Sequence, residues 1–179
     1  IVWKVNSLQD KEIIDELYKA SQAGVTVKLV VRGICCLRPG RVGLSENIEV
    51  FSIVGDYLEH ARIFYFHNNG LSLVYSGSAD AMVRSFDRRI ESLYLIVDDK
   101  LKKEVINILA FNLKDNVNAY KMMEDGTYEK VPVEKDAKTF NVHEEFYHVK
   151  EENFLDIEHL FDKKEKRLKM PPTEIIHVN

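Results

Sequence analysis

The stretch that decides the fold is IVWKVNSLQDKEIIDELYKASQAGVTVKLVVRG, residues 1–33. VWKV is expected to form a short strand. Residues 6–24 carry the signals of a helix that Ser7 caps, with Asp10 three positions on, and that Gly24 ends. The β-branched run after Gly24 is nearly unbroken, which is typical of a strand covered on both faces. The segment therefore predicts a strand–helix–strand unit and an α/β fold.

Further elements extend this unit along the chain. Strands are expected at residues 48–54, 61–66, 71–76 and 92–97, an amphipathic helix at about 99–113, and a hairpin turn at Asp125-Gly126. We therefore place one α/β domain at residues 1–130. Residues 131–179 form a charged C-terminal extension with a helical arm expected at 143–169, whose lysine-rich stretch 163–169 is interpreted as a solvated helix face.

Composition excludes several classes of protein. The 179 residues, 45% hydrophobic and 30% charged, suffice for one buried domain with a smaller appendage. A net charge of −4 argues against a protein that binds polyanions over its whole surface, and no nucleic-acid partner is expected. We find no apolar run near the roughly 20 residues of a membrane span and no leader segment, so a cytoplasmic location is expected. The adjacent Cys35 and Cys36 are interpreted as reduced thiols, and no metal site is predicted.

The arginines are unevenly placed. Seven of the eight lie between residues 32 and 89, whereas the lysines gather towards the ends of the chain. Arginine's planar fork matches two phosphate oxygens at once. The pattern suggests a local anion site, with ordinary surface ion pairs as the alternative.

A histidine and an arginine head the aromatic run HARIFYF, residues 60–66. If this run is one strand, His60 and Arg62 share a face. Imidazole can act as nucleophile or proton donor near neutral pH, and a neighbouring guanidinium can hold a phosphoryl oxygen. The alternative is a core histidine surrounded by packed side chains.

A second polar segment, residues 76–91, follows this run. Its small Gly77 and Ser78 allow close backbone approach. Supporting roles are expected for Ser78, Asp80, Arg89 and Glu91. Among these, Glu91 is the candidate to orient an imidazole by accepting its second N–H.

Together the two segments resemble half of a phospholipase D-type site, in which a histidine and a lysine precede a Gly-Ser pair, an asparagine and a glutamate. The chain departs from that pattern in four ways, one of which is a longer gap before Gly77. Arg62 stands in place of the lysine, His67 in place of an aspartate, and Asp80 in place of the asparagine. These departures argue against ordinary phosphodiester hydrolysis.

Longer blocks resemble the C-terminal catalytic domain of the bacterial polyphosphate kinases, nearly block for block from residue 3 to about 130. The blocks are NSLQDKEIIDELYKASQAGV, VVRGICCLRPG, GLSENIEVFSIVGDYLEHARIFYF and SADAMVRSFDRRIE. One departure is Ala81, where many relatives are expected to carry an aromatic residue. The resemblance implies a phospholipase D-like mixed sheet flanked by helices.

The resemblance also implies an activity. Members of this family reversibly transfer the terminal phosphate of ATP to inorganic polyphosphate through a phosphohistidine in a preceding domain. His60 is then assigned to proton transfer or to stabilising the leaving phosphate. Arg32 matches the arginine that contacts nucleotide phosphates, and Arg62 is expected to bind phosphate beside His60.

The same resemblance implies the partners: ATP or ADP, polyphosphate, the preceding domains and further copies of a homo-oligomer. Mg²⁺ is expected with the nucleotide, but we identify no ligands for it in this chain. Two other functions stay open. One is a phospholipase D-like phosphodiesterase or nuclease completed by dimerisation, and the other is a non-catalytic scaffold that acts through residues 143–169.

Overall fold

The strand–helix–strand unit predicted at the N-terminus is present at the centre of the fold. A computed structural model describes residues 1–83, 85, 90–133 and 137–160. Eight strands form one mixed sheet in the order β6-β5-β4-β1-β2-β3-β7-β8. The strands are β1 (Val2–Val5), β2 (Val27–Val31), β3 (Ile48–Ile53), β4 (Ile63–Phe66), β5 (Leu73–Gly77), β6 (Leu93–Leu95), β7 (Ala119–Met122) and β8 (Tyr128–Lys130).

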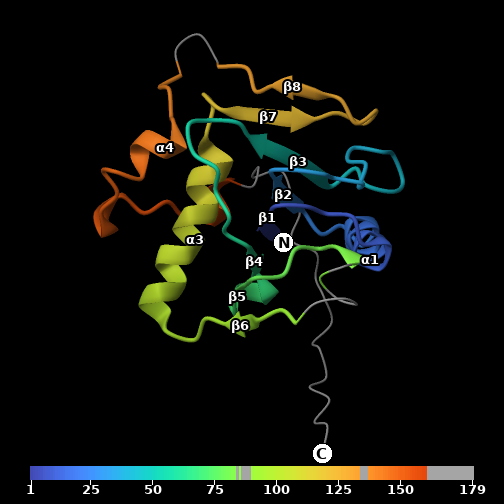
Figure 1. Ribbon diagram of the computed structural model, residues 1–179, viewed down its shortest axis with the longest axis horizontal. Coiled ribbons are helices and arrows are strands. Elements are labelled where there is room, and N and C mark those ends of the chain that lie inside the picture. Colours follow the sequence, from blue (N-terminus) through green and yellow to red (C-terminus); the bar gives the residue numbers. More distant parts are fainter. Residues whose placement is uncertain (84, 86–89, 134–136, 161–179) are drawn as a thin grey trace, which may run out of the picture.

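Two helices lie on opposite sides of this sheet, α1 and the longer α3 (Figure 1). The helices are α1 (Lys11–Gln22), α3 (Asp99–Lys114) and α4 (Val142–Glu145), with the 3-10 turns η1 (Asn68–Gly70), η2 (Glu151–Asn153) and η3 (Ile157–Leu160). None of the helices in the described part of the chain is long and apolar enough to cross a membrane.

Alternation along β1 divides the core between the two faces of the sheet. Trp3 and Val5 pack with residues of α1, and Val2 packs with Leu109 and Ala110 of α3. β1 and β2 are buried at nearly every position, as expected for strands covered on both faces. The α/β prediction rests on this pattern, and the structure bears it out.

Helix α1 starts later than predicted. Asp10 is the N-cap, and its carboxylate accepts a hydrogen bond from the backbone N–H of Ile13 at 3.0 Å. The prediction that Ser7 caps the helix is therefore wrong. The backbone N–H of Ser7 donates to Asp80 at 3.3 Å, and Leu8 forms β-bridges to Cys35 and Ala81. These tertiary contacts keep residues 6–9 out of the helix.

The strand directions bring the candidate residues to one edge of the sheet. β1, β2 and β3 are parallel, β4 runs antiparallel to β1, and β5 reverses direction again. The segments that follow β1, β2, β3 and β5 therefore meet the segment that precedes β4. We call this the site edge. Ligands of open α/β sheets commonly bind beyond the carboxyl ends of parallel strands.

The predicted strand over residues 60–66 is shorter than expected. β4 begins at Ile63, because its pairing with β1 ends at the Lys4–Ile63 pair. His60 lies in the segment 54–62 that joins β3 to β4, and its side chain is exposed. The expectation that His60 and Arg62 share a strand face is therefore wrong. Both residues still lie at the site edge.

The C-terminal segment is helical only in short turns. From residue 137 to residue 160 it forms α4, η2 and η3, and η3 lies against α3. One anchor is the backbone N–H of Leu155, which donates to the Asn107 side chain of α3 at 2.8 Å. The lysine-rich stretch 163–169 and the end of the predicted arm lie outside the described residues.

Candidate functional site

A chain of hydrogen bonds links the predicted residues across the site edge. Arg32, directly after β2, donates from Nε to the Asn6 Oδ1 atom at 3.1 Å. The backbone N–H of Asn6 donates to Asp80 Oδ1 at 2.7 Å. Segments that follow β1, β2 and β5 are therefore held together by polar contacts, and Arg32 is placed by this network.

Asp80 extends the network to the segment before β4. The Arg62 guanidinium donates from Nε to Asp80 Oδ1 at 3.3 Å and from Nη2 to Oδ2 at 3.1 Å. Its Nη1 atom donates to the His60 carbonyl at 2.9 Å. Arg62 thus ties the backbone of His60 to the buried Asp80, whose side chain is 6% exposed.

The Asp80 carboxylate is held in its charged form. Burial on its own would raise its pKa, but hydrogen bonds from Arg62 and from the Asn6 backbone outweigh this and hold the pKa below the usual 3.8. Asp80 therefore supplies a fixed negative charge that orients Arg62.

His60 presents its imidazole to solvent. The side chain is exposed, and within the described part of the chain no hydrogen bond or ion pair holds the ring. The core-histidine alternative does not fit this environment. A ligand at the site edge can reach the ring without displacing a protein contact.

Ser78 and Glu91 pair with each other at the same edge. The Ser78 hydroxyl donates to the Glu91 carboxylate, and the backbone N–H of Ser92 donates to the Ser78 hydroxyl at 3.1 Å. Gly77 permits this close approach, because a Cβ atom there would lie 2.0 Å from the Ser92 carbonyl oxygen. The expected contact between Glu91 and the His60 ring stays a prediction, and Arg89 lies outside the described residues.

A buried charged cluster that sequence reasoning missed lies beside these residues. Glu59 bridges Lys4 of β1 and His143 of α4, with a distance of 3.2 Å to each. Lys4 also donates to Asn112 of α3 at 3.3 Å. Lys4 in an otherwise apolar strand and Glu59 beside His60 were signals available in the sequence. His143 gave none, since 84 residues separate it from Glu59.

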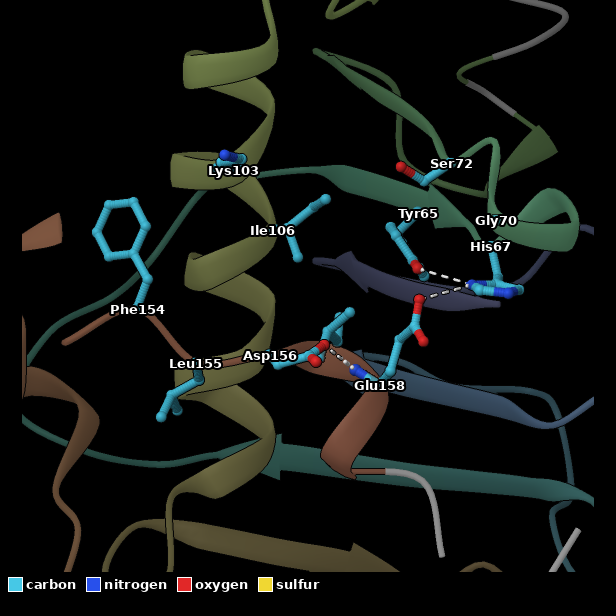
Figure 2. Close-up of a pocket in the computed structure, with 11 residues that line it drawn as sticks. Tyr65, His67, Gly70, Ser72, Lys103, Ile106, Phe154, Leu155, Asp156 and Glu158 are labelled. Carbon is cyan, nitrogen blue, oxygen red and sulfur yellow. Dashed lines mark hydrogen bonds and ion pairs between the residues drawn. The ribbon is translucent and has the colours of Figure 1, made fainter. Parts of the chain in front are cut away.

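A hollow of about 380 Å³ lies at the end of β4 opposite to His60. Figure 2 shows the side chains that line it. Tyr65 and His67 approach Glu158 there, and the Nδ1 atom of His67 lies 3.3 Å from the Glu158 carboxylate. His67 occupies the position where a phospholipase D-type aspartate was expected. It lies at the far end of β4, so it is separate from the network around His60.

The described residues do not fit a magnesium site. Among them no group of three or more histidine, cysteine, aspartate or glutamate side chains could hold a metal ion. Both Asp80 oxygens already accept bonds from Arg62, and the Glu91 carboxylate accepts one from Ser78. We therefore derive no step through a metal held by these groups.

Comparison with known proteins assigns the family. The family described as "Polyphosphate kinase C-terminal domain 2" matches residues 1–142. The chain belongs to the polyphosphate kinase family. A polyphosphate kinase of Rhodopirellula baltica is 47% identical over 153 residues, which cover 86% of this chain and 18% of that protein. One of Synechocystis sp. is 54% identical over 128 residues, or 72% of this chain and 18% of that protein.

A solved structure supports the fold. The crystal structure of polyphosphate kinase from Porphyromonas gingivalis superposes with a TM-score of 0.79 at 41% identity, covering 82% of this chain and 22% of that one. The predicted phospholipase D-like mixed sheet and the resemblance to polyphosphate kinases are thus confirmed. The chain spans about a fifth of the length of these polyphosphate kinases.

The Asp80–Arg62 pair is expected to stabilise this polyphosphate kinase domain. Asp80→Asn should lower the free energy of unfolding at pH 7 by about 3 kcal/mol, because it leaves a largely buried guanidinium without its charged partner. The folded-state pKa of Asp80 lies below 3.8, so the contribution is present above pH 3.8 and lost as pH falls through the folded-state pKa. Denaturant titrations at several pH values measure this.

Asp15→Asn is the matched control. Asp15 pairs with Lys11 on the surface of α1, and its side chain is 44% exposed. Such surface pairs contribute roughly 0–1 kcal/mol. The assigned role of Asp80 would be contradicted if both variants lost the same free energy of unfolding. It would also be contradicted if the loss in Asp80→Asn became larger below pH 3.8.

Proposed function

We propose that this chain is the C-terminal catalytic domain of a longer polyphosphate kinase, which reversibly transfers the terminal phosphate of ATP to inorganic polyphosphate. The observation that carries the proposal is the placement of Arg32 and the exposed His60 at the site edge of a domain from this family. The preceding domains of the relatives would supply the remainder of the site.

Arg32 is proposed to bind nucleotide phosphates. Its Nε atom is committed to Asn6 in the described structure, and this bond fixes the plane of the guanidinium. A guanidinium held in this way can still offer its terminal N–H groups to phosphate oxygens in pairs. This role agrees with the position of Arg32 beyond the carboxyl end of β2.

His60 is proposed to act on the phosphoryl group without forming the covalent adduct. Phosphoryl transfer depends chiefly on positioning and on neutralising developing charge. An exposed imidazole can donate a proton to a departing phosphate oxygen, or stabilise that oxygen as imidazolium. The nucleophilic histidine would lie in a preceding domain, where its nitrogen takes the phosphate as the bond to ADP breaks.

Arg62 is proposed to act mainly through His60. Its guanidinium already binds Asp80 and the His60 carbonyl, so its first contribution is to hold the backbone of His60 in place. Direct binding of phosphate by Arg62 stays a prediction. The supporting roles of Ser78 and Glu91 also stay predictions.

The metal ion, the cellular location and the oligomeric state are proposed from the resemblance to the family. Mg²⁺ would accompany ATP, held by its phosphates or by residues outside the described part of the chain. A cytoplasmic location and a homo-oligomeric full-length enzyme remain predictions.

The direct test is an assay of the full-length protein that contains this chain. Given ATP, Mg²⁺ and a short polyphosphate primer, it should lengthen the primer and release ADP, and excess ADP should reverse the reaction. The comparison substrate is a phosphodiester, bis(p-nitrophenyl) phosphate, supplied without ATP. Turnover of the phosphodiester alone would overturn the proposal in favour of a phospholipase D-like hydrolase.

The 179-residue chain on its own is expected to fold but not to make polyphosphate. Its sheet buries apolar residues of both faces against α1 and α3, so it has a core of its own. It lacks the proposed nucleophile. Circular dichroism should show a cooperative melt, and primer extension should be absent. Sustained synthesis of polyphosphate by the isolated chain would show that the complete site lies within it.

A further inference from the structure

The residues on both sides of His60 fix its backbone to the rest of the domain, and they do so through different contacts. On its C-terminal side, Arg62 ties the His60 carbonyl to Asp80, as described above. On its N-terminal side the anchor is Glu59. Residues 54–58 and His60 itself are exposed, whereas the Glu59 side chain turns inward and is 21% exposed. Glu59 is thus the residue between positions 54 and 60 whose side chain packs into the domain.

Both oxygens of the Glu59 carboxylate are engaged. Oε2 lies 3.2 Å from Lys4 Nζ, and Oε1 lies 3.2 Å from His143 Nε2. Lys4 and His143 are each only 4% exposed. Because a carboxylate can only accept, His143 donates from Nε2. A two-point contact of this kind fixes the orientation of the carboxylate as well as its position.

Further contacts fit His143 to the same segment. A Cβ atom at Gly55 would lie 2.6 Å from His143 Nδ1, so only glycine lets the ring pack this closely. The Tyr57 ring meets the His143 ring edge to face at 5.3 Å, and its hydroxyl pairs with that of Tyr147. Segment 54–62 therefore rests on the α4 region as well as on the sheet.

His143 lies one residue beyond the match to the family model, which ends at residue 142. It falls within the 153 residues that align with the Rhodopirellula baltica polyphosphate kinase, so the contact with Glu59 belongs to the part of the chain that resembles these relatives. A small hollow beside these residues is lined by Lys4, Arg32, Glu59 and His143, together with Val30, Ile53 and Tyr57. Arg32 and the anchor of His60 consequently share one set of neighbours.

We propose that Glu59, held between Lys4 and His143, positions the His60 ring for phosphate, so that the C-terminal segment completes the site edge. The catalytic part of this inference rests on the function proposed above. Glu59, Lys4 and His143 are positioning residues, because they act through the backbone of segment 54–62. No contact of their own with a substrate is required.

The charge balance explains why a carboxylate occupies this position. Burial lowers the pKa of Lys4, and the nearby Arg32 lowers it further, whereas Glu59 raises it by Coulomb attraction and a hydrogen bond. Without Glu59, the hollow lined by Lys4, Arg32 and His143 would have no carboxylate among its lining residues to offset the two cations. Removal of Glu59 therefore perturbs the fold as well, and the sharper test changes His143.

The first experiment compares His143→Ala, His143→Gln and the exposed-site control His148→Ala in the 179-residue chain. Glutamine keeps an N–H donor for Glu59, and alanine does not. The readout is the imidazole resonance of His60 in a heteronuclear NMR spectrum. We expect His143→Ala to shift and broaden this resonance, and the other two variants to leave it near the parental position. An unchanged resonance in His143→Ala overturns the inference, whatever the protein's function.

The second experiment measures kinetics of the same variants in the full-length enzyme. A small displacement of a catalytic group can cost up to about a hundredfold in rate. His143→Ala should lower kcat by roughly ten- to a hundredfold with KM for ATP changed less than about threefold. His143→Gln should recover most of kcat, and His148→Ala all of it.

The kinetic outcomes separate the two proposals. A parental kcat in His143→Ala, or equal losses in the alanine and glutamine variants, overturns the positioning role. If the parental enzyme makes no polyphosphate from ATP, the proposed function fails. The NMR comparison then still decides whether His143 and Glu59 position the His60 ring through the backbone of segment 54–62.

Discussion

His60→Ala in the full-length enzyme is expected to reduce kcat for ATP-dependent polyphosphate synthesis by roughly 10²–10⁴-fold, the usual contribution of a proton-transferring side chain. The melting temperature should stay within about 2 °C of the parental value, because an exposed side chain contributes little to stability. Steady-state assays of ADP release and a thermal melt of the same preparation measure both quantities.

His159→Ala is the matched control for this change. His159 is another exposed histidine, in the C-terminal segment, and it pairs only loosely with Asp156 at 3.7 Å. Its replacement should leave kcat at the parental value. Equal activity of His60→Ala and the parent would remove His60 from the site. A large fall in melting temperature would instead return it to a structural role.

Arg32→Lys is expected to weaken the use of nucleotide much more than it weakens the fold. Lysine keeps the charge but loses the planar fork and the Nε–H that binds Asn6. Charge-assisted bonds to phosphate contribute about 1.5–3 kcal/mol each. The loss of one such bond corresponds to a rise of about ten- to a hundredfold in KM for ATP.

Arg41→Lys controls for the general effect of exchanging arginine for lysine. Arg41 is 49% exposed and lies 4.0 Å from Glu124. Calorimetric titration with a non-hydrolysable ATP analogue should give parental affinity for Arg41→Lys and a weakened one for Arg32→Lys. Unchanged affinity and rate in Arg32→Lys would refute the nucleotide contact.

The regular part of the fold was predictable because local and global signals agree there. The β-branched run before Arg32 is buried on both faces, and the periodic apolar residues of α1 and α3 lie against the sheet. Where a tertiary contact competes with a local signal, the prediction failed. Serine is a common N-cap residue, but the backbone N–H of Ser7 donates a hydrogen bond to Asp80, 73 residues away.

The candidate site was predictable only in part, for a related reason. The resemblance to polyphosphate kinases and to a phospholipase D-type site assigned Arg32, His60 and Asp80 to one site, and strand direction in the structure explains why they lie at one edge of the sheet. Spacing could not show that β4 loses its partner before His60, since that depends on where β1 ends. The contact of His143 with Glu59 had no local signature, because distant side chains meet there only through the folding of the C-terminal segment onto α3.

The assignment of roles to histidines is the central claim, and one measurement tests it most directly. The full-length enzyme is incubated with ATP labelled at the terminal phosphate, quenched in alkali to preserve phosphohistidine, digested and mapped by peptide sequencing. We predict an acid-labile label on a histidine outside these 179 residues and none on His60. A label on His60 would show that it is the nucleophile and that the proton donor must be sought elsewhere.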